Sequence, residues 1–265
     1  MSASALPPFL QDLHRGAEQL WLAAHHDWPE LRIEVLPETD STNSQLMQRA
    51  RHGQRDTVVM TTAHQTAGRG RLGRQWQDQP GQTLMFSVGM PLTRSDVSGL
   101  SLCVGVALAE VLGPPVQLKW PNDLWVKHQG QWRKLGGVLT EIAHDGQHAY
   151  VVVGVGINLH SPPSLDSASV APIGLSAFGH AATADQCLAD LAGAVLRALR
   201  AFMRDGFTPW VQRFNTLDAL ANQPVQLSDG RQGTARGVAS DGALLLETSD
   251  QRLSIHSQEV SVRPC

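Results

Sequence analysis

The sequence predicts an α+β protein, with a large domain of interleaved strands and helices and a small all-β domain after it. Three observations support this class. Helical periodicity and β-branched runs interleave from residue 31 to about residue 215, and only short alternating runs follow residue 220. The length of 265 residues, 42% of them hydrophobic, suits one large and one small packed domain. We therefore expect an N-terminal helical segment over 1–30, a main domain over 31–220 and a C-terminal domain over 221–265.

The N-terminal segment predicts one amphipathic helix over residues 8–26, because apolar side chains recur there every three or four positions. Residues 1–30 carry four acidic side chains against the single base Arg15. A helix-turn-helix DNA reader needs further helices and a basic face. We therefore expect no DNA binding by this segment.

The main domain is expected to mix strands and helices. Asp40-Ser41-Thr42-Asn43 has the composition of a helix N-cap, and Asp205-Gly206 has that of a helix stop. Pro121-Asn122-Asp123 separates two strand-like runs and predicts a hairpin turn. The expected helices cover residues 44–51, 97–112 and 184–204. The expected strands cover residues 32–36, 57–63, 84–88, 116–120, 124–127, 135–143 and 150–155, and a loop rich in Ser, Pro and Ala covers 161–174.

The C-terminal domain is predicted from four short alternating runs, which cover residues 225–227, 233–238, 243–247 and 251–256. Asp-Gly and Ser-Asp turns separate these runs. Such spacing is typical of a small β-barrel.

Composition excludes several classes of protein. The net charge of −3 gives no overall attraction for nucleic acid or an anionic membrane. Cys103, Cys187 and Cys265 are far apart and odd in number, so neither a disulfide framework nor a metal cage is expected. The start of the chain lacks a signal-peptide pattern, and no apolar run approaches about 18 residues. A soluble, cytoplasmic protein without membrane contact is expected.

The segment Gly68-Arg69-Gly70-Arg71-Leu72-Gly73-Arg74 is the most informative in the chain. Glycine allows the backbone to approach a ligand, and arginine offers a planar fork to phosphate or carboxylate oxygens. The pattern predicts an oxyanion clamp. A solvated basic loop or an RGG-like nucleic-acid segment is the alternative. No Gly-x4-Gly-Lys-Ser/Thr motif occurs, so a nucleotide would be held without a P-loop.

Lysine is confined to a short stretch. Lys119, Lys127 and Lys134 are the only three lysines among 21 lysines and arginines. A compact ammonium is favoured at such positions, although chance usage is the alternative. Lys134 precedes Gly136-Gly137 inside a predicted strand, where paired glycines indicate close approach of a ligand or backbone. The turn at Asp123 follows Lys119-Trp120, and it could be purely structural.

Together these segments resemble the catalytic core of biotin–protein ligases, over residues 36 to 262. The segments that carry the resemblance are Ser41-Thr42-Asn43, Gln65 with Gly68–Trp76, Lys119-Trp120-Pro121-Asn122-Asp123, Lys134–Glu141, Gly154-Val155-Gly156-Ile157-Asn158 and the C-terminal Gly242–Glu247. Each motif is modest alone, and their shared order makes the resemblance specific. The segment before residue 31 lacks the winged helix of the bifunctional ligase-repressors, so the resemblance is to the monofunctional type.

The resemblance implies a fold and a reaction. The fold would be a mixed sheet like that of class II aminoacyl-tRNA synthetases and biotin ligases, followed by an SH3-like barrel. The enzyme would be an AMP-forming biotin–[acetyl-CoA-carboxylase] ligase with ATP and biotin as substrates and Mg²⁺ expected, although no motif specifies metal ligands. Its partner would be the biotin carboxyl carrier domain of acetyl-CoA carboxylase. The resemblance leaves monomer and homodimer open.

The resemblance also implies roles for individual residues. Lys134, Arg69 and Asp123 would be catalytic, with Lys134 bridging the biotin carboxylate and the α-phosphate and Asp123 receiving or orienting the acceptor amine. The residues that would surround biotin are Ser41, Thr42, Asn43, Gln65, Gly68, Arg69, Arg71, Lys134, Gly136, Gly137, Gly154 and Gly156. The residues that would hold ATP or the adenylate are Arg69, Arg71, Arg74, Trp76, Asn122 and Asn158.

Alternatives accompany these roles. Ser41, Thr42 and Gln65 could instead cap a helix and satisfy a strand end. Trp120 is expected to pack in the core, whereas Trp76 would line the pocket. Leu72 stands where many family members carry another Arg, so the loop has one charge fewer. The rival functions are a lipoate–protein ligase or octanoyltransferase of related fold, a biotin-responsive DNA-binding repressor, and an RNA-binding module.

Overall fold

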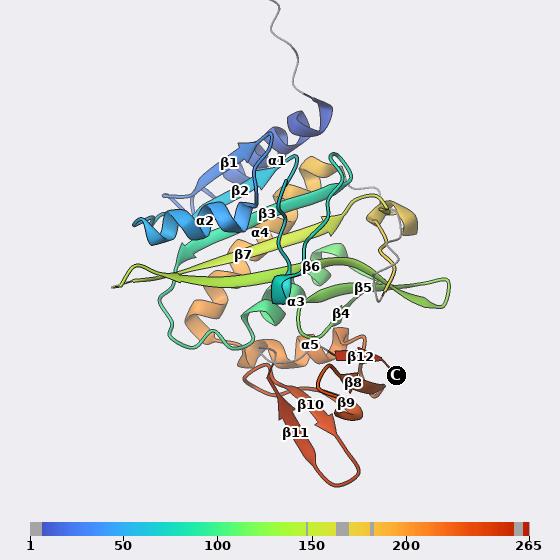
Figure 1. Cartoon of the computed structure of the whole chain (residues 1–265). Coiled ribbons are helices and arrows are strands. Elements are labelled where there is room, and N and C mark those ends of the chain that lie inside the picture. The colour runs from blue at the N-terminus through green and yellow to red at the C-terminus, as the bar shows by residue number, and fades with distance from the viewer. Residues whose placement is uncertain (1–6, 147, 163–169, 181–182, 257–261, 265) are drawn as a thin grey trace, which may run out of the picture.

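The large domain is organised around one seven-stranded sheet. The computed structural model describes residues 7–146, 148–162, 170–180, 183–256 and 262–264. The strand order is β1-β2-β3-β7-β6-β5-β4, with β1 parallel to β2 and the other neighbours antiparallel (Figure 1). The strands are β1 Arg32–Leu36, β2 Val58–Thr62, β3 Thr83–Pro91, β4 Val116–Lys119, β5 Asp123–His128, β6 Gln131–His144 and β7 Ala149–Asn158. The sheet is therefore mixed, as the resemblance implies.

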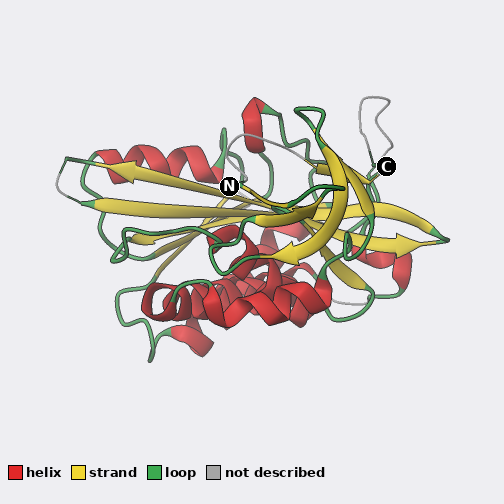
Figure 2. Ribbon diagram, turned by 90° about the horizontal axis from the view of Figure 1, so that it is seen from below, coloured by secondary structure: helices red, strands yellow, loops and turns green. Residues whose placement is uncertain are grey.

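Helices cover both faces of this sheet unequally. They are α1 Pro8–Ala24, α2 Thr42–Arg51, α3 Leu100–Leu112, α4 Ala184–Asp205 and α5 Val211–Leu217. Most of them gather on one side, where α1 and α3 pack against α4 and α4 packs on β3 (Figure 2). The helix α2 lies on the sheet against β3, β6 and β7. Its N-terminus is thereby held over the middle of the sheet.

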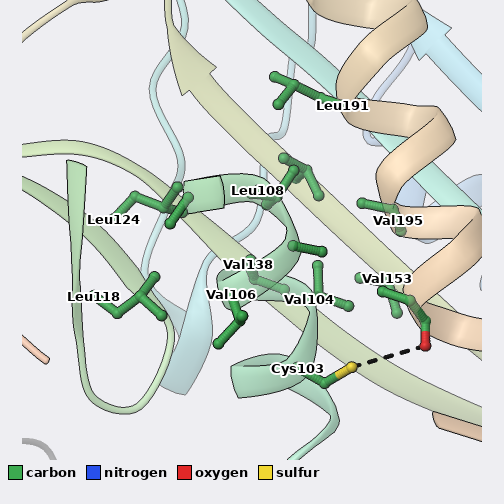
Figure 3. Packing of buried hydrophobic residues seen from close by; sticks show 14 of the residues in the cluster. Cys103, Val104, Val106, Leu108, Leu118, Leu124, Val138, Val153, Leu191 and Val195 are labelled. Carbon is green, nitrogen blue, oxygen red and sulfur yellow. Dashed lines mark hydrogen bonds between the residues drawn. The ribbon is translucent and has the colours of Figure 1, made fainter. Parts of the chain in front are cut away.

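The core between α3, α4 and the sheet is aliphatic. Val104 and Leu108 of α3 lie near Leu191 and Val195 of α4 (Figure 3), and all four are fully buried. The thiol of Cys103 donates to the backbone carbonyl of Ala198 at 3.7 Å. Each buried aliphatic side chain contributes about 1.5–3 kcal/mol relative to exposure. This packing gives the overlying strands a fixed position.

The C-terminal residues form a five-stranded antiparallel sheet of order β11-β10-β9-β8-β12. Its strands are β8 Pro224–Leu227, β9 Gln232–Val238, β10 Leu244–Glu247, β11 Arg252–Ile255 and β12 Val262–Pro264. Within the described residues β11 and β12 are edges and no pairing closes the sheet. The sheet is tied to the large domain, because the indole Nε1 of Trp120 donates to the carbonyl of Gly242 at 3.1 Å.

The sequence-based elements are confirmed, with shifted ends. α2 begins two residues early, at Thr42, because Ser41 is its N-cap. α3 begins three residues late, at Leu100, because Gly99 adopts a left-handed φ of 79°. The short helix α5 and the strand β12 were not predicted. The domain boundaries stay a prediction, and most of the expected 161–174 loop lies outside the described residues.

The described helices bear on whether the chain could cross a bilayer. Among the described helices, none combines the length and the apolar character that a bilayer span requires.

Candidate functional site

A cavity of about 170 Å³ lies where the N-terminus of α2, the Gly/Arg loop and strands β3 to β7 meet. Most of the predicted site residues line it. They are Ser41, Thr42, Asn43, Gln65, Arg69, Arg71, Arg74, Trp76, Asn122, Asp123, Lys134, Gly137, Gly154 and Gly156. Segments from residue 41 to residue 156 thus converge on one site.

Part of the cavity wall, here called the floor, consists of neutral hydrogen-bonding groups. Ser41 caps α2, and its Oγ accepts from the backbone N–H of Ser44 at 3.5 Å. The backbone N–H of Thr42 donates to Gln65 Oε1 at 2.8 Å, which satisfies a free donor of the first helical turn. Ser41, Thr42 and Gln65 are almost fully buried. Ser41 therefore caps the helix and Gln65 satisfies its first turn, and both residues also line the cavity wall.

The floor continues into the sheet through Asn43. Its Oδ1 accepts from Ser87 Oγ at 2.6 Å, and its Nδ2 donates to Glu141 Oε2 at 3.0 Å. Ser87 also shares a hydrogen bond of 2.6 Å with Thr42 Oγ1. A Cβ at position 154 would collide with the Asn43 side chain, so Gly154 is required for this arrangement.

The cavity wall also carries a cluster of one carboxylate and two ammonium groups. Lys134 Nζ lies 2.6 Å from Asp123 Oδ1, and Lys119 Nζ lies 3.8 Å from Asp123 Oδ2. Lys119 is only 8% exposed. Burial lowers the pKa of Lys119 to about 8, while the attraction of Asp123 opposes that shift.

A β-bulge brings Lys134 to this cluster. Asp123 pairs with Gly137 and Leu124 with Gly136, but Trp125 pairs with Lys134, so Leu135 is the additional residue on β6. A bulge reverses the facing of the residues beyond it. Leu135 therefore enters the core, and Lys134 faces the cavity together with Gly137. A Cβ at Gly137 would stand 3.4 Å from Asp123 Oδ1.

The Gly/Arg loop forms part of the cavity wall. Arg69 pairs with Glu141 of β6 through its Nη2, 2.9 Å from Oε1. Arg71, Leu72 and Arg74 also line the cavity. Burial lowers the pKa of Arg71, and the nearby Asp123 carboxylate opposes this. Leu72 is 61% exposed and has a left-handed φ of 55°.

Trp76 lines the cavity, whereas Trp120 packs in the core. The ring of Trp76 packs against Gly156, where a Cβ would strike it, and Lys134 Nζ lies 5.8 Å from its centroid. The Trp76 indole N–H has no hydrogen-bond partner within the described residues, which suits it to a ligand oxygen. Trp120 is completely buried in the core.

Three predicted residues do not line the cavity. A Cβ at Gly68 would meet the backbone of Trp76, and one at Gly136 would meet Gly156 and Ile157. Asn158 Nδ2 donates to the carbonyl of Ile173 at 3.2 Å. These residues support neighbouring segments in this structure, and their predicted contacts with biotin or nucleotide stay predictions.

Comparisons with known proteins identify the family of the chain. The sequence model of the Biotin/lipoate A/B protein ligase family matches residues 35–158, and that of the Biotin protein ligase C terminal domain matches residues 221–263. The biotin–[acetyl-CoA-carboxylase] ligase of Mycobacterium tuberculosis is 30% identical, over 93% of this chain and 94% of that protein. The bifunctional ligase/repressor of Salmonella typhimurium is 34% identical, over 87% of this chain and 74% of that protein. The chain belongs to the biotin protein ligase family.

The fold gives the same result. The biotin protein ligase of Aquifex aeolicus, solved in complex with biotin and ATP, superposes with a TM-score of 0.74 and 26% identity. The match covers 88% of this chain and 99% of that one.

The donor set of this biotin ligase does not fit a metal held by the protein. Among the described residues, no group of three or more His, Cys, Asp or Glu side chains could hold an ion. Asp123 is the one acidic residue on the described wall of the cavity, and Lys134 and Lys119 occupy its oxygens. The expected Mg²⁺ would therefore have to be carried by ATP phosphates.

Sequence reasoning assigned no role to three polar residues of the ligase site: Lys119, Ser87 and Glu141. Two of these residues could have been found from the sequence. Ser87 is a polar residue within the buried strand β3, and Lys119 is one of the three lysines in the chain. Glu141 ends the motif segment Lys134–Glu141, but its partners lie about 70 and 100 residues away, so the motif did not indicate its role.

Proposed function

We propose that this chain joins biotin to ATP as biotinyl-5′-AMP and then transfers biotin to a lysine of a biotin carboxyl carrier domain. One observation carries the proposal: a single cavity is lined both by neutral hydrogen-bonding groups, which form its floor, and by the Lys119–Asp123–Lys134 cluster. The floor suits the uncharged ureido ring of biotin. The cationic cluster suits a carboxylate and a phosphate, whose charges repel each other in water.

In the first step a biotin carboxylate oxygen attacks the α-phosphorus, and the bond to the β-phosphate oxygen breaks with loss of pyrophosphate. Lys134 is placed to touch both reacting groups when it turns from Asp123. Arg71 and Arg74 add positive charge from the loop, and the Trp76 indole N–H is a further donor. Positioning and charge stabilisation supply the rate enhancement, and no enzyme nucleophile is required.

In the second step the acceptor amine attacks the acyl carbon of the mixed anhydride, and AMP leaves. The amine must be neutral to attack, and it releases a proton as the amide forms. Asp123 is the carboxylate on the cavity wall that would orient the amine and receive this proton. Asn122, whose Nδ2 donates to the carbonyl of Val138 at 2.9 Å, would place the nucleotide beside it.

The finer expectations belong to the same proposal. Closure of the C-terminal sheet into an SH3-like barrel is supported by the match to the ligase C-terminal domain. A carrier domain of acetyl-CoA carboxylase is the proposed acceptor, in line with the name of the Mycobacterium tuberculosis relative. A cytoplasmic location and the choice between monomer and homodimer stay predictions.

The test is exchange of labelled pyrophosphate into ATP, with biotin, lipoate or no acid added. Exchange with biotin alone is the expected result. Exchange with lipoate and none with biotin would overturn the proposal in favour of a lipoate ligase. Addition of purified carrier domain should then convert the retained adenylate to biotinylated carrier and AMP.

A further inference from the structure

The Gly/Arg loop is tied to the sheet by an ion pair that the proposed chemistry does not use. Arg69 Nη1 donates to Glu141 Oε2 at 3.1 Å, and its Nη2 lies 2.9 Å from Oε1. Two nitrogens of one guanidinium thus meet two oxygens of one carboxylate. This fork-to-fork geometry fixes direction as well as distance. The pair joins the loop to β6 across 72 residues of sequence.

The Glu141 carboxylate is itself held in place. Its side chain is 19% exposed, and Oε2 also accepts from Asn43 Nδ2 at 3.0 Å. Asn43 is fixed in turn by Ser87 and by the carbonyl of Leu139. Such a carboxylate does not have to be ordered when the arginine arrives, so less conformational entropy is lost on pairing.

The same hydrogen bonds lead to the cavity floor. Ser87 connects Asn43 to Thr42, and Thr42 is bonded to Gln65. All four of these residues are buried. A ligand bound at Thr42 or Gln65 would therefore steady the group that orients Glu141.

We propose that Glu141 is a positioning residue that latches the Gly/Arg loop over the cavity through Arg69, and so retains the reactive adenylate until the acceptor lysine arrives. The inference rests on the proposed function and deepens it. It also divides the loop by role. Arg69 serves the latch, whereas the charge of Asp123 acts on Arg71, and the charges of Arg71 and Arg74 act on Lys119.

The alternative is that Arg69 leaves Glu141 and binds the oxyanion directly. The two ideas differ in what a mutation changes. Loss of a latch speeds escape of the adenylate and leaves the maximal exchange rate almost unchanged. Loss of an oxyanion ligand lowers the maximal exchange rate itself.

The experiment is a double-mutant cycle with Glu141→Gln, Arg69→Met and the double variant in the full chain. Adenylate formed from labelled biotin and ATP is followed by its release from the protein, and maximal biotin-dependent exchange is measured in parallel. We expect each single variant to shorten retention about tenfold, and the double variant to be no worse than either single variant. Maximal exchange in Glu141→Gln should change less than about threefold.

Glu34→Gln is the matched control. Glu34 also pairs with an arginine, Arg49 at 2.7 Å, but on β1 and outside the lining of the cavity. The Glu34→Gln variant should retain the adenylate as the parent does. If Glu141→Gln fails to fold, Arg69→Lys replaces it, because lysine keeps the charge and loses the fork; a shorter retention time is again expected.

Retention that is unchanged, or effects of the two substitutions that simply add, would overturn the latch. So would a large loss of maximal exchange in Arg69→Met that Glu141→Gln does not share. The parent protein separates this failure from failure of the proposed function. Absence of biotin-dependent exchange in the parent refutes the function, whereas normal exchange with unchanged retention refutes only the latch.

Discussion

The two basic regions that face the cavity are built in different ways. Lys119 and Lys134 come from strands and converge on one carboxylate, with Lys119 almost completely buried. Arg69, Arg71 and Arg74 come from a loop, and Leu72 at its tip is 61% exposed. The lysine region is positioned by the sheet, and the arginine region by a few contacts across the loop.

This difference suggests a division of labour. A reacting carboxylate and phosphate need charges that are already in place, because reorganisation during the reaction costs rate. A lid must open for substrate and close again, so marginal local stability suits it. We therefore expect mutations in the lysine region to change chemistry or stability, and mutations in the loop to change retention.

The largest effect is expected at Lys134. Lys134→Ala removes the ammonium that touches Asp123 and should lower the maximal rate of biotin-dependent exchange by about a thousandfold, within the range for loss of a transition-state contact. Thermal unfolding should be unchanged. Lys127→Ala is the matched control, since Lys127 lies on the same hairpin, over the ring of Trp132. An exchange rate close to that of the parent would remove Lys134 from the mechanism.

The contribution of Asp218, which lies beside the lysine region, to folding stability is expected to depend on pH. The backbone N–H of Ala219 donates to the carbonyl of Leu118 in β4, and this places Asp218 beside the strand that carries Lys119. Burial raises the pKa of Asp218 from 3.8 to about 6. The folded state therefore holds this proton more tightly than the unfolded state, and stability from this group is full below pH 3.8 and is lost as pH rises through 6.

Asp218→Asn should remove the loss of stability that accompanies ionisation of Asp218 as pH rises. We expect a gain in unfolding free energy of about 1–3 kcal/mol at pH 8, and little gain at pH 4. Urea unfolding at both pH values measures it. An equal effect at the two pH values would show that the ionisation of Asp218 does not matter, and that the strand is supported in another way.

A smaller effect is expected at Lys119. Its amine loses its proton near pH 8, so exchange in the parent should decline as pH rises through that value. Lys119→Met should be about tenfold slower at pH 7 and should lack this decline, since one charge near the cluster is worth about 1.4 kcal/mol. Lys119→Arg should shift the decline to higher pH. An unshifted decline in Lys119→Arg would assign it to another group.

The smallest effect is expected at Leu72 in the loop. Leucine at a φ of 55° is strained, and glycine adopts this conformation freely. Leu72→Gly should change maximal exchange by less than about threefold. A loss as large as that at Lys134 would contradict the division between the two regions.

Most elements and most of the site could be predicted from local patterns. Periodicity located the helices, and the capping cluster at Asp40–Asn43 located the start of α2 within two residues. Leu72 drew attention by its departure from the family pattern, and the structure adds that it is exposed and has a left-handed φ. Asn158 and Gly136 show the limit of motifs, since they lie in motif segments and do not line the cavity.

The sequence by itself determined which residue types are available: a Gly/Arg loop after a strand, three clustered lysines, and an Asp on a tight turn. The tertiary structure decided which of them meet. Strict alternation would place Lys134 and Gly137 on opposite faces of β6, and the bulge at Leu135 puts them on the same face. The pairing of Arg69 with Glu141 likewise depends on strand register and on the path of the loop. Contacts over such separations are set by the packing of the whole sheet, and no local pattern encodes them.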